Sequence, residues 1–208
     1  MRILLIAATT FEIDHFIKNN KNVEILICGV GTPETMYHLT KKILQDTYDL
    51  VIQAGIGGAF SKKLKKGEVV LVKQDAFADV GAEANGVFKT IFQLGFGDGN
   101  KFPFSKGWLV NQNEILQTTH LQVVSAVTVN KLSDRKKQTL QFQKVFDADI
   151  ESMEGAALHY ACLQNNIPFL QMRSISNRVG ERDRKKWKMK EALKNLNIEL
   201  IKLVKTLY

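Results

Sequence analysis

Short, uninterrupted apolar runs that end in small residues constrain the fold of this chain most. Runs of this kind span residues 2–9, 23–31, 49–60, 67–80, 120–130 and 167–176. An apolar run without polar alternation is typical of a strand buried on both faces, as in a parallel sheet. Helix signals separate several of these runs. The alternation predicts an α/β fold with a mixed, mostly parallel, twisted central sheet flanked by helices.

Several segments between and after the runs carry helix signals. Thr32, as a capping side chain, precedes Pro33 and Glu34, which is typical of a helix start. Further helices are expected at 134–146 and directly after "MEGAA", and apolar residues recurring every three or four positions predict an amphipathic helix over about 187–208. The glycine-rich segment 81–106 has no clear period and is predicted to be a long surface loop. The length fits one domain over residues 1–208.

Charge and cysteine content restrict the class of protein. The formal net charge is +8, but the densest basic runs, 61–68, 133–138 and 181–190, are interleaved with acids and form no continuous stripe with aromatics. We therefore expect a solvated surface and no nucleic-acid partner. Cys28 and Cys162 lie in separate apolar segments, which predicts buried, reduced thiols. Glu12 and Asp14 follow the first apolar run directly, so we expect neither a signal peptide nor a membrane span, and a cytoplasmic protein.

Polar and small residues gather where the predicted strands end. In open α/β sheets, ligands bind beyond the carboxyl ends of the strands. The residues at these ends are Glu12, Gly55, Gly57, Gly58, Thr128, Asn130, Met153, Glu154, Ser176 and Asn177. We expect them to converge on one pocket.

Each of these features also fits a simpler explanation. "GIGG" is neither GxGxxG nor a P-loop, so a dinucleotide site is not expected. Glu12 and Glu154, taken singly, fit acids that interact with helix N-termini. The histidines are isolated and the chain has no HExxH, so we expect no metal. "SISN" is not the GxSxG nucleophile elbow, and no serine hydrolase is indicated.

The combination of segments is more specific than its parts. "MEGAA" (153–157), "IPFLQMRSISN" (167–177) and a first strand ending in "AATTFE" (7–12) together resemble the nucleoside phosphorylase and nucleosidase superfamily. "ILICGVGTPET" and "DLVIQAGIGGAFSKKLKKGEVVLV" match the second and third strand regions of that family in order, so the resemblance covers nearly the whole chain. The chain is most similar to the methylthioadenosine/S-adenosylhomocysteine nucleosidases and the futalosine hydrolases. A nucleoside phosphorylase-like fold is implied.

The resemblance implies cleavage of an N-ribosidic bond and a role for several residues. Glu154 would accept hydrogen bonds from the ribose hydroxyls and Met153 would pack on the sugar. Glu12 would orient and deprotonate the attacking water. The remaining residues would line the base pocket, with the backbone of Ile56, Gly57 and Gly58 and the side chains of Thr128 and Val129. A carboxylate near the ribose stabilises the positive charge of an oxocarbenium-like transition state.

Two features bear on the nucleophile and the base. Phosphorylases of the superfamily carry arginines around phosphate after the first strand, whereas "AATTFEID" offers an acid and no arginine, which favours water. Adenine-releasing relatives have an aspartate where this chain has Asn177. An amide both donates and accepts, which suits a 6-oxopurine with O6 as an acceptor and, in one tautomer, N7–H as a donor, as in related phosphorylases selective for such bases. Hypoxanthine is therefore favoured over adenine.

The tail 176–193 resembles the futalosine hydrolase branch. Arg178 or Arg182 would then bind the carboxylate of the substrate; a salt-bridged surface loop is the alternative. Ser152 stands where adenine-specific relatives often have glutamate, and Glu151 is left out of the predicted site.

The expected reaction is hydrolysis of futalosine to hypoxanthine and dehypoxanthine futalosine, in menaquinone biosynthesis, by a homo-oligomer that needs no cofactor. The alternatives are an adenine-releasing nucleosidase, a purine nucleoside phosphorylase and a non-catalytic binding protein.

Overall fold

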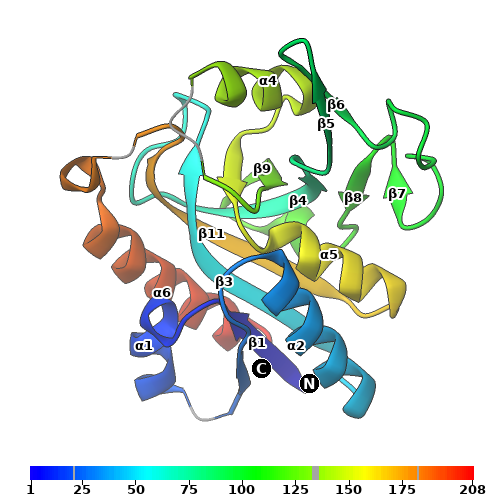
Figure 1. Cartoon of the computed structure of the whole chain (residues 1–208). Coiled ribbons are helices and arrows are strands. Elements are labelled where there is room, and N and C mark those ends of the chain that lie inside the picture. Colours follow the sequence, from blue (N-terminus) through cyan, green and yellow to red (C-terminus); the bar gives the residue numbers. More distant parts are fainter. Residues whose placement is uncertain (21, 133–135, 182) are drawn as a thin grey trace.

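The computed structural model describes residues 1–20, 22–132, 136–181 and 183–208 (Figure 1). The strands are β1 (Ile3–Ala7), β2 (Glu24–Ile27), β3 (Leu50–Ala59), β4 (Val69–Phe77), β5 (Gly81–Ala84), β6 (Val87–Thr90), β7 (Phe104–Ser105), β8 (Trp108–Val110), β9 (Gln122–Thr128), β10 (Ile150–Ser152) and β11 (Phe169–Arg178). The α-helices are α1 (Thr10–Asn19), α2 (Thr32–Gln45), α3 (Ile115–Thr118), α4 (Lys136–Phe146), α5 (Gly155–Gln164) and α6 (Met189–Thr206).

The central sheet is mixed, and part of it closes on itself. Within the described residues, the strand order is β2-β1-β3-β10-β9-β4-β8-β7, and β11 pairs with both β3 and β4. Strands β3, β10, β9, β4 and β11 therefore form a closed five-stranded barrel. The β3–β10 and β4–β11 pairs are antiparallel, and the other three pairs of the barrel are parallel. The α/β class and the mixed sheet agree with the sequence prediction. The sequence suggested an open sheet, so the closed barrel was not predicted.

Helices cover both faces of the part of the sheet formed by β1 and β3. Figure 1 shows α1 and α6 on one side of β1 and β3, and α2 and α5 on the other. Alternate residues of β1 pack in opposite directions: Leu5 joins the core cluster that contains Leu200 of α6, and Ile6 joins the one that contains Leu39 of α2. Burial on both faces explains why the strand sequence shows no polar alternation.

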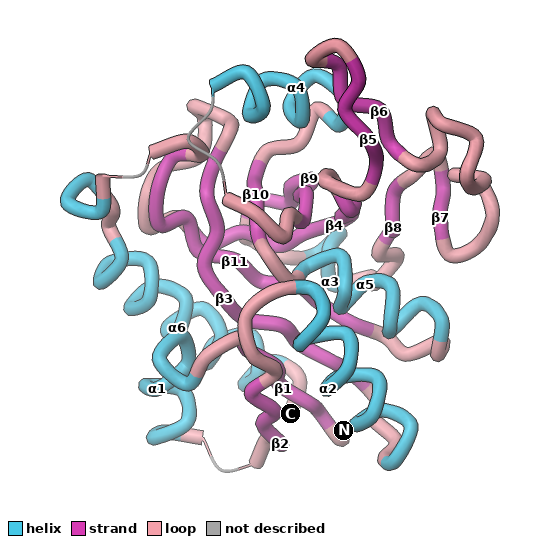
Figure 2. The backbone as a smooth tube through the Cα atoms, in the orientation of Figure 1, coloured by secondary structure: helices cyan, strands magenta, loops and turns pink. Residues whose placement is uncertain are grey.

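The segment 81–106 differs from the predicted loop. Strands β5 and β6 form an antiparallel hairpin, seen beside α4 in Figure 2. Asn85 and Gly86 connect them with φ angles of 52° and 72°. Positive φ at both central residues is typical of a type I′ turn, for which Asn-Gly is the preferred sequence. The local turn signal was therefore present, although the flanking strands lack an alternating pattern.

Other local predictions can be compared directly with the structure. Cys28 and Cys162 are buried and free, as predicted. Helix α2 begins at Thr32 with proline in its first turn, but Gly31, with φ 94°, is the capping residue and no side chain caps this end. Among the described helices, none has the length and apolar content needed to cross a membrane.

Candidate active site

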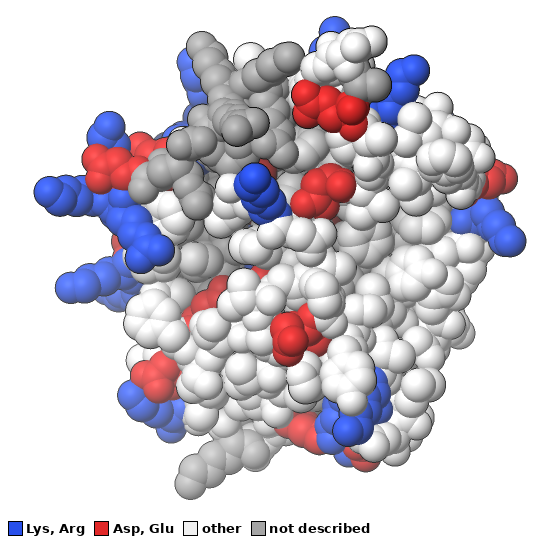
Figure 3. Space-filling view, viewed as in Figure 1, with Lys and Arg blue, Asp and Glu red and all other residues white. Residues whose placement is uncertain are grey.

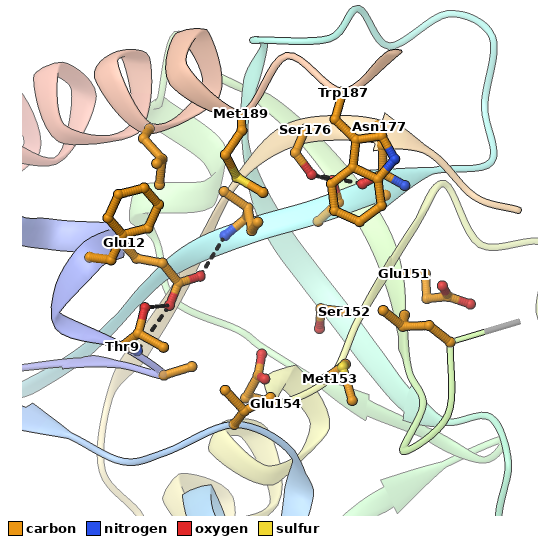
Figure 4. A pocket seen from close by; sticks show the side chains of 18 of the residues that line it. Thr9, Glu12, Glu151, Ser152, Met153, Glu154, Ser176, Asn177, Trp187 and Met189 are labelled. Carbon is orange, nitrogen blue, oxygen red and sulfur yellow. Dashed lines mark hydrogen bonds between the residues drawn. The ribbon is translucent and has the colours of Figure 1, made fainter. Parts of the chain in front are cut away.

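A cavity of about 250 Å³ lies where several strand ends meet the start of α6. The turn after β1, the C-terminal part of β3, the β10–α5 junction and the end of β11 form its walls. In Figure 4, Glu12 and Glu154 approach one end of the cavity, and Asn177 and Trp187 lie at the other. Four of the five predicted strand ends thus meet at the cavity, whereas Thr128 and Asn130 at the end of β9 do not line it.

Glu12 is held in the first turn of α1. Its Oε2 accepts a hydrogen bond from the Thr9 amide at 3.1 Å, and its Oε1 accepts one from the Ile56 amide at 3.1 Å. The residue is 7% exposed. Burial raises the pKa of the Glu12 carboxyl, and the positive charge of Arg173 opposes this rise. A positioned carboxylate with a raised pKa is suited to accept a proton.

Glu154 lies at the junction between β10 and α5. Its Oε1 accepts from the Gly31 amide at 3.1 Å, and its Oε2 accepts from Nη1 of Arg173 at 3.3 Å. Arg173 is 1% exposed and also donates from Nη2 to Oε1 of Gln53 at 2.8 Å. A buried cation beside two buried acids offsets part of the cost of their desolvation. Arg173 belongs to the motif "IPFLQMRSISN", but the sequence pattern alone predicts no role for it.

Ser176 and Asn177 follow one another near the end of β11. The Ser176 hydroxyl donates to Oδ1 of Asn177 at 2.7 Å, and Nδ2 of Asn177 donates to the Arg178 carbonyl at 2.8 Å. Reversing the amide would place two carbonyl oxygens against each other at Arg178. The orientation of the amide is therefore fixed, and Nδ2 has a second N–H besides the one that it donates to the Arg178 carbonyl.

The other residues predicted for the base pocket fall into two groups. Ile56, Gly57 and Gly58 line the cavity, and so does Met153 from the predicted ribose site. Thr128 and Val129 are fully buried and do not line it. Thr128 is engaged elsewhere, since its hydroxyl donates to Asp75 and accepts from the Ala156 amide.

Of the two arginines predicted for the substrate carboxylate, Arg178 does not line the cavity. The Arg178 side chain donates to the Ser61 carbonyl and borders a separate hollow with Lys62 and Val179. Arg182 lies outside the described residues. Conversely, Glu151, which the sequence analysis left out, lines the cavity.

Two cavity residues from the basic tail were missed by sequence reasoning. Trp187 and Met189 line the cavity just before and at the start of α6. Nε1 of Trp187 donates to the Glu181 carbonyl at 2.8 Å, which fixes the indole. The only sequence signal for these two residues was the presence of a tryptophan within a run of charged residues.

Figure 3 shows Lys and Arg side chains interspersed with Asp and Glu on one face of the molecule.

Within the ranges that the structure describes, no group of three or more His, Cys, Asp or Glu residues is arranged to hold a metal ion.

Comparison with known proteins gives matches over nearly the whole chain. Residues 6–207 match the family model described as the phosphorylase superfamily. The futalosine hydrolase of Streptomyces coelicolor is 34% identical over 161 residues, which are 77% of this chain and 67% of the relative. The futalosine hydrolase of Thermus thermophilus is 28% identical over 171 residues, or 81% of this chain and 75% of the relative.

A solved structure shares the fold. The 5'-methylthioadenosine/S-adenosylhomocysteine nucleosidase of Neisseria meningitidis, in complex with methylthio-immucillin-A, superposes with a TM-score of 0.80 and 18% identity over 99% of both chains. Together with the family match over residues 6–207, these relatives establish that the chain belongs to the phosphorylase superfamily.

Proposed function

We propose that this protein hydrolyses the N-ribosidic bond of futalosine and releases hypoxanthine and dehypoxanthine futalosine, a step toward menaquinone. Hydrolysis of an N-glycosyl bond is the general activity that the named relatives have in common. The observation that carries the proposal is the convergence of Glu12 and Glu154 on one cavity, with Arg173 in contact with Glu154 and Asn177 at the far end.

The contacts of Glu12 define its proposed role as general base. Oε2 accepts from both the amide and the hydroxyl of Thr9, whereas Oε1 accepts from the Ile56 amide and retains a lone pair that would accept a hydrogen bond from a water molecule. The oxygen of that water would attack the anomeric carbon while Glu12 takes its proton. The bond between the anomeric carbon and the base nitrogen breaks, and its electron pair leaves with the purine. Glu154 and Met153 would hold the ribose and stabilise the positive charge that grows on it.

The orientation of Asn177 supports a purine with acceptors on the edge it faces. Because Ser176 donates to Oδ1 and Arg178 accepts one N–H of Nδ2, the second N–H of Nδ2 would be the group that meets the base at this end of the cavity. In N9-linked nucleosides N7 accepts a hydrogen bond in both purines, and the bases differ at the sixth position, where hypoxanthine has the acceptor O6 and adenine an amino donor. An N–H of Asn177 that reaches O6 would therefore favour a 6-oxopurine, and one that reaches N7 would withdraw electrons from either leaving group.

The rival activity is release of adenine from methylthioadenosine, supported by the shared fold with the Neisseria meningitidis nucleosidase. The decisive experiment is phosphate-free incubation of the purified protein with futalosine and, separately, with methylthioadenosine, followed by chromatography of the released base. Hypoxanthine from futalosine and little adenine supports the proposal. Adenine from methylthioadenosine alone overturns the substrate assignment, and turnover that requires phosphate overturns hydrolysis.

We also propose that the protein forms a homo-oligomer in which a second copy covers the cavity mouth. Phe11 and Val30 line the cavity and are 67% and 56% exposed. Large apolar side chains at the rim of a pocket favour a covering partner. Light scattering coupled to size-exclusion chromatography tests this directly, and a monomer at micromolar concentration contradicts it.

A further inference from the structure

A buried polar cluster lies beneath the first turn of α5, outside the cavity. It consists of Asp75 of β4, Thr128 of β9, His159 of α5 and Gln171 of β11, all fully buried. Oδ1 of Asp75 accepts from the Thr128 hydroxyl at 3.0 Å and from the Ala76 amide at 2.8 Å. None of the four residues lines the cavity. Burying a carboxyl group carries a large desolvation cost, so the cluster calls for a structural or functional reason.

The Thr128 hydroxyl connects this cluster to α5. Its single proton is donated to Asp75, so its lone pairs face the Ala156 amide, which donates to it at 2.7 Å. Ala156 is the second residue of α5, and the amides of the first turn have no partner inside the helix. Thr128, which lies on β9, therefore caps the N-terminus of α5, and Asp75 sets the direction of the capping hydroxyl.

Gly155 shows how closely the helix start approaches the cluster. A Cβ at this position would lie 2.1 Å from both Oδ2 of Asp75 and Nε2 of Gln171. The Gly155 amide also donates to the Ser152 hydroxyl at 3.3 Å. The first turn of α5 thus rests directly on the cluster, and the residue that precedes it is Glu154.

We propose that Thr128 and Asp75 are positioning residues that hold the start of α5, and through it the Glu154 carboxylate, in the geometry needed to bind the ribose hydroxyls. The inference rests on the proposed function for its catalytic consequence. Glu154 spans two fixed partners, the Gly31 amide and the Arg173 guanidinium, at 3.1 and 3.3 Å. A displacement of the helix start would lengthen both contacts and withdraw the carboxylate from the sugar.

The test compares Thr128→Val with Thr128→Ser. Valine keeps the shape of threonine but removes the hydroxyl, whereas serine keeps the hydroxyl. Futalosine and its 2′-deoxy derivative are the probes, and the readout is the ratio of their kcat/KM values. A hydrogen bond between a carboxylate and a hydroxyl is worth about a tenfold preference or more. We expect Thr128→Val to lower the ribose preference about tenfold and Thr128→Ser to restore it.

A second measurement does not depend on turnover. Native-state hydrogen exchange of the Ala156 amide should accelerate at least about tenfold in Thr128→Val, because the amide loses its acceptor, and stay close to wild type in Thr128→Ser. Asp75→Leu removes the acceptor of the Thr128 proton, so it should also lower the ribose preference and accelerate exchange of the Ala156 amide. This variant replaces Thr128→Val in the test if Thr128→Val does not fold.

The outcomes separate the two proposals. Loss of kcat with an unchanged ribose preference would mean that the pair supports the fold only, and this overturns the positioning role. Unchanged exchange at Ala156 overturns it as well. A wild-type protein that cleaves no futalosine refutes the proposed substrate, and the exchange experiment then still decides whether Thr128 holds the helix start.

Discussion

At the residue scale, glycine at position 55 leaves room for the charged side chains of Glu12 and Arg173. A Cβ at position 55 would lie 2.4 Å from Nη1 of Arg173 and 3.0 Å from Oε1 of Glu12. Because glycine leaves this space open, the guanidinium can lie beside both Glu12 and Glu154. Without that cation, two carboxylates in one buried site would repel each other and one would stay protonated. Gly55 is thus part of the electrostatics of the site.

Glu12→Gln should remove the base and leave the fold intact. Glutamine can keep one amide contact through its oxygen but cannot take a proton from water, so kcat should fall by about 100- to 10,000-fold. KM for futalosine should change much less. The matched control is Asp14→Asn, a half-exposed residue of the same helix that forms a salt bridge with Lys18. Equal steady-state rates for wild type and Glu12→Gln would exclude Glu12 as the base.

Asn177→Asp should change the preferred purine. The carboxylate loses the N–H that faces the base and can accept from an adenine amino group. We expect the kcat/KM ratio of futalosine to methylthioadenosine to fall at least about tenfold. Ser176→Ala, which frees the amide to rotate, should lower this ratio in the same direction but less.

Ser174→Ala is the control for Ser176→Ala, since Ser174 lies on the same strand and does not line the cavity. If the ratio is the same in Asn177→Asp as in wild type, Asn177 does not select the base.

At the element scale, the long buried strands were predictable because burial on both faces produces an apolar run without polar alternation, whereas the short strands within 81–106 were not. Strand β3 falls within the predicted run 49–60, and most of β11 within 167–176. Closure of the barrel was not predictable. It depends on β11 pairing with β3 on one side and β4 on the other, and no local pattern records such a long-range contact.

The site was predictable to a similar extent. Glu12, Glu154 and Asn177 converge because their strand ends do. Thr128 also ends a strand, but its side chain contacts Asp75 and α5 instead of the cavity. The direction of one side chain depends on strand register and twist, which the sequence pattern leaves open. The role of Arg173 was missed because the residue lies within a buried strand, and only the structure shows that its side chain is buried in contact with Glu154.

Gly155→Ala should destabilise the protein by forcing α5 away from the sheet. The added methyl would lie 2.1 Å from Asp75 Oδ2 and from Gln171 Nε2. Overpacking of this kind costs about 1–3 kcal/mol of unfolding free energy, measurable by urea denaturation. Gly97→Ala is the control, because its Cβ would meet only Phe92 at an ordinary 3.5 Å. Equal losses in both variants would mean that α5 adjusts without strain.

At the scale of the whole molecule, the protein buries ionisable groups deep in its core. Desolvation raises the pKa of Asp75 to about 7 and lowers that of His159 to about 4. Both shifts favour the neutral forms. The His159 ring faces the Leu109 carbonyl through Nδ1 and lies beside Gln171. Stability should therefore depend on pH through groups that the cavity does not expose.

Asp75→Asn isolates one of these groups. Between about pH 4 and pH 7, the folded wild type keeps the Asp75 proton, while the unfolded chain releases it near its ordinary pKa of 3.8. The folded state then binds one proton more, so the contribution of Asp75 to stability falls as pH rises through this window. Asparagine does not titrate, and His159 is common to both proteins. The unfolding free energy of Asp75→Asn relative to wild type should therefore rise by about 1.4 kcal/mol per pH unit in this window and level off above pH 7. Urea denaturation at intervals from pH 4.5 to pH 8 measures the difference, and a constant value throughout would show that Asp75 is already ionised in the folded core.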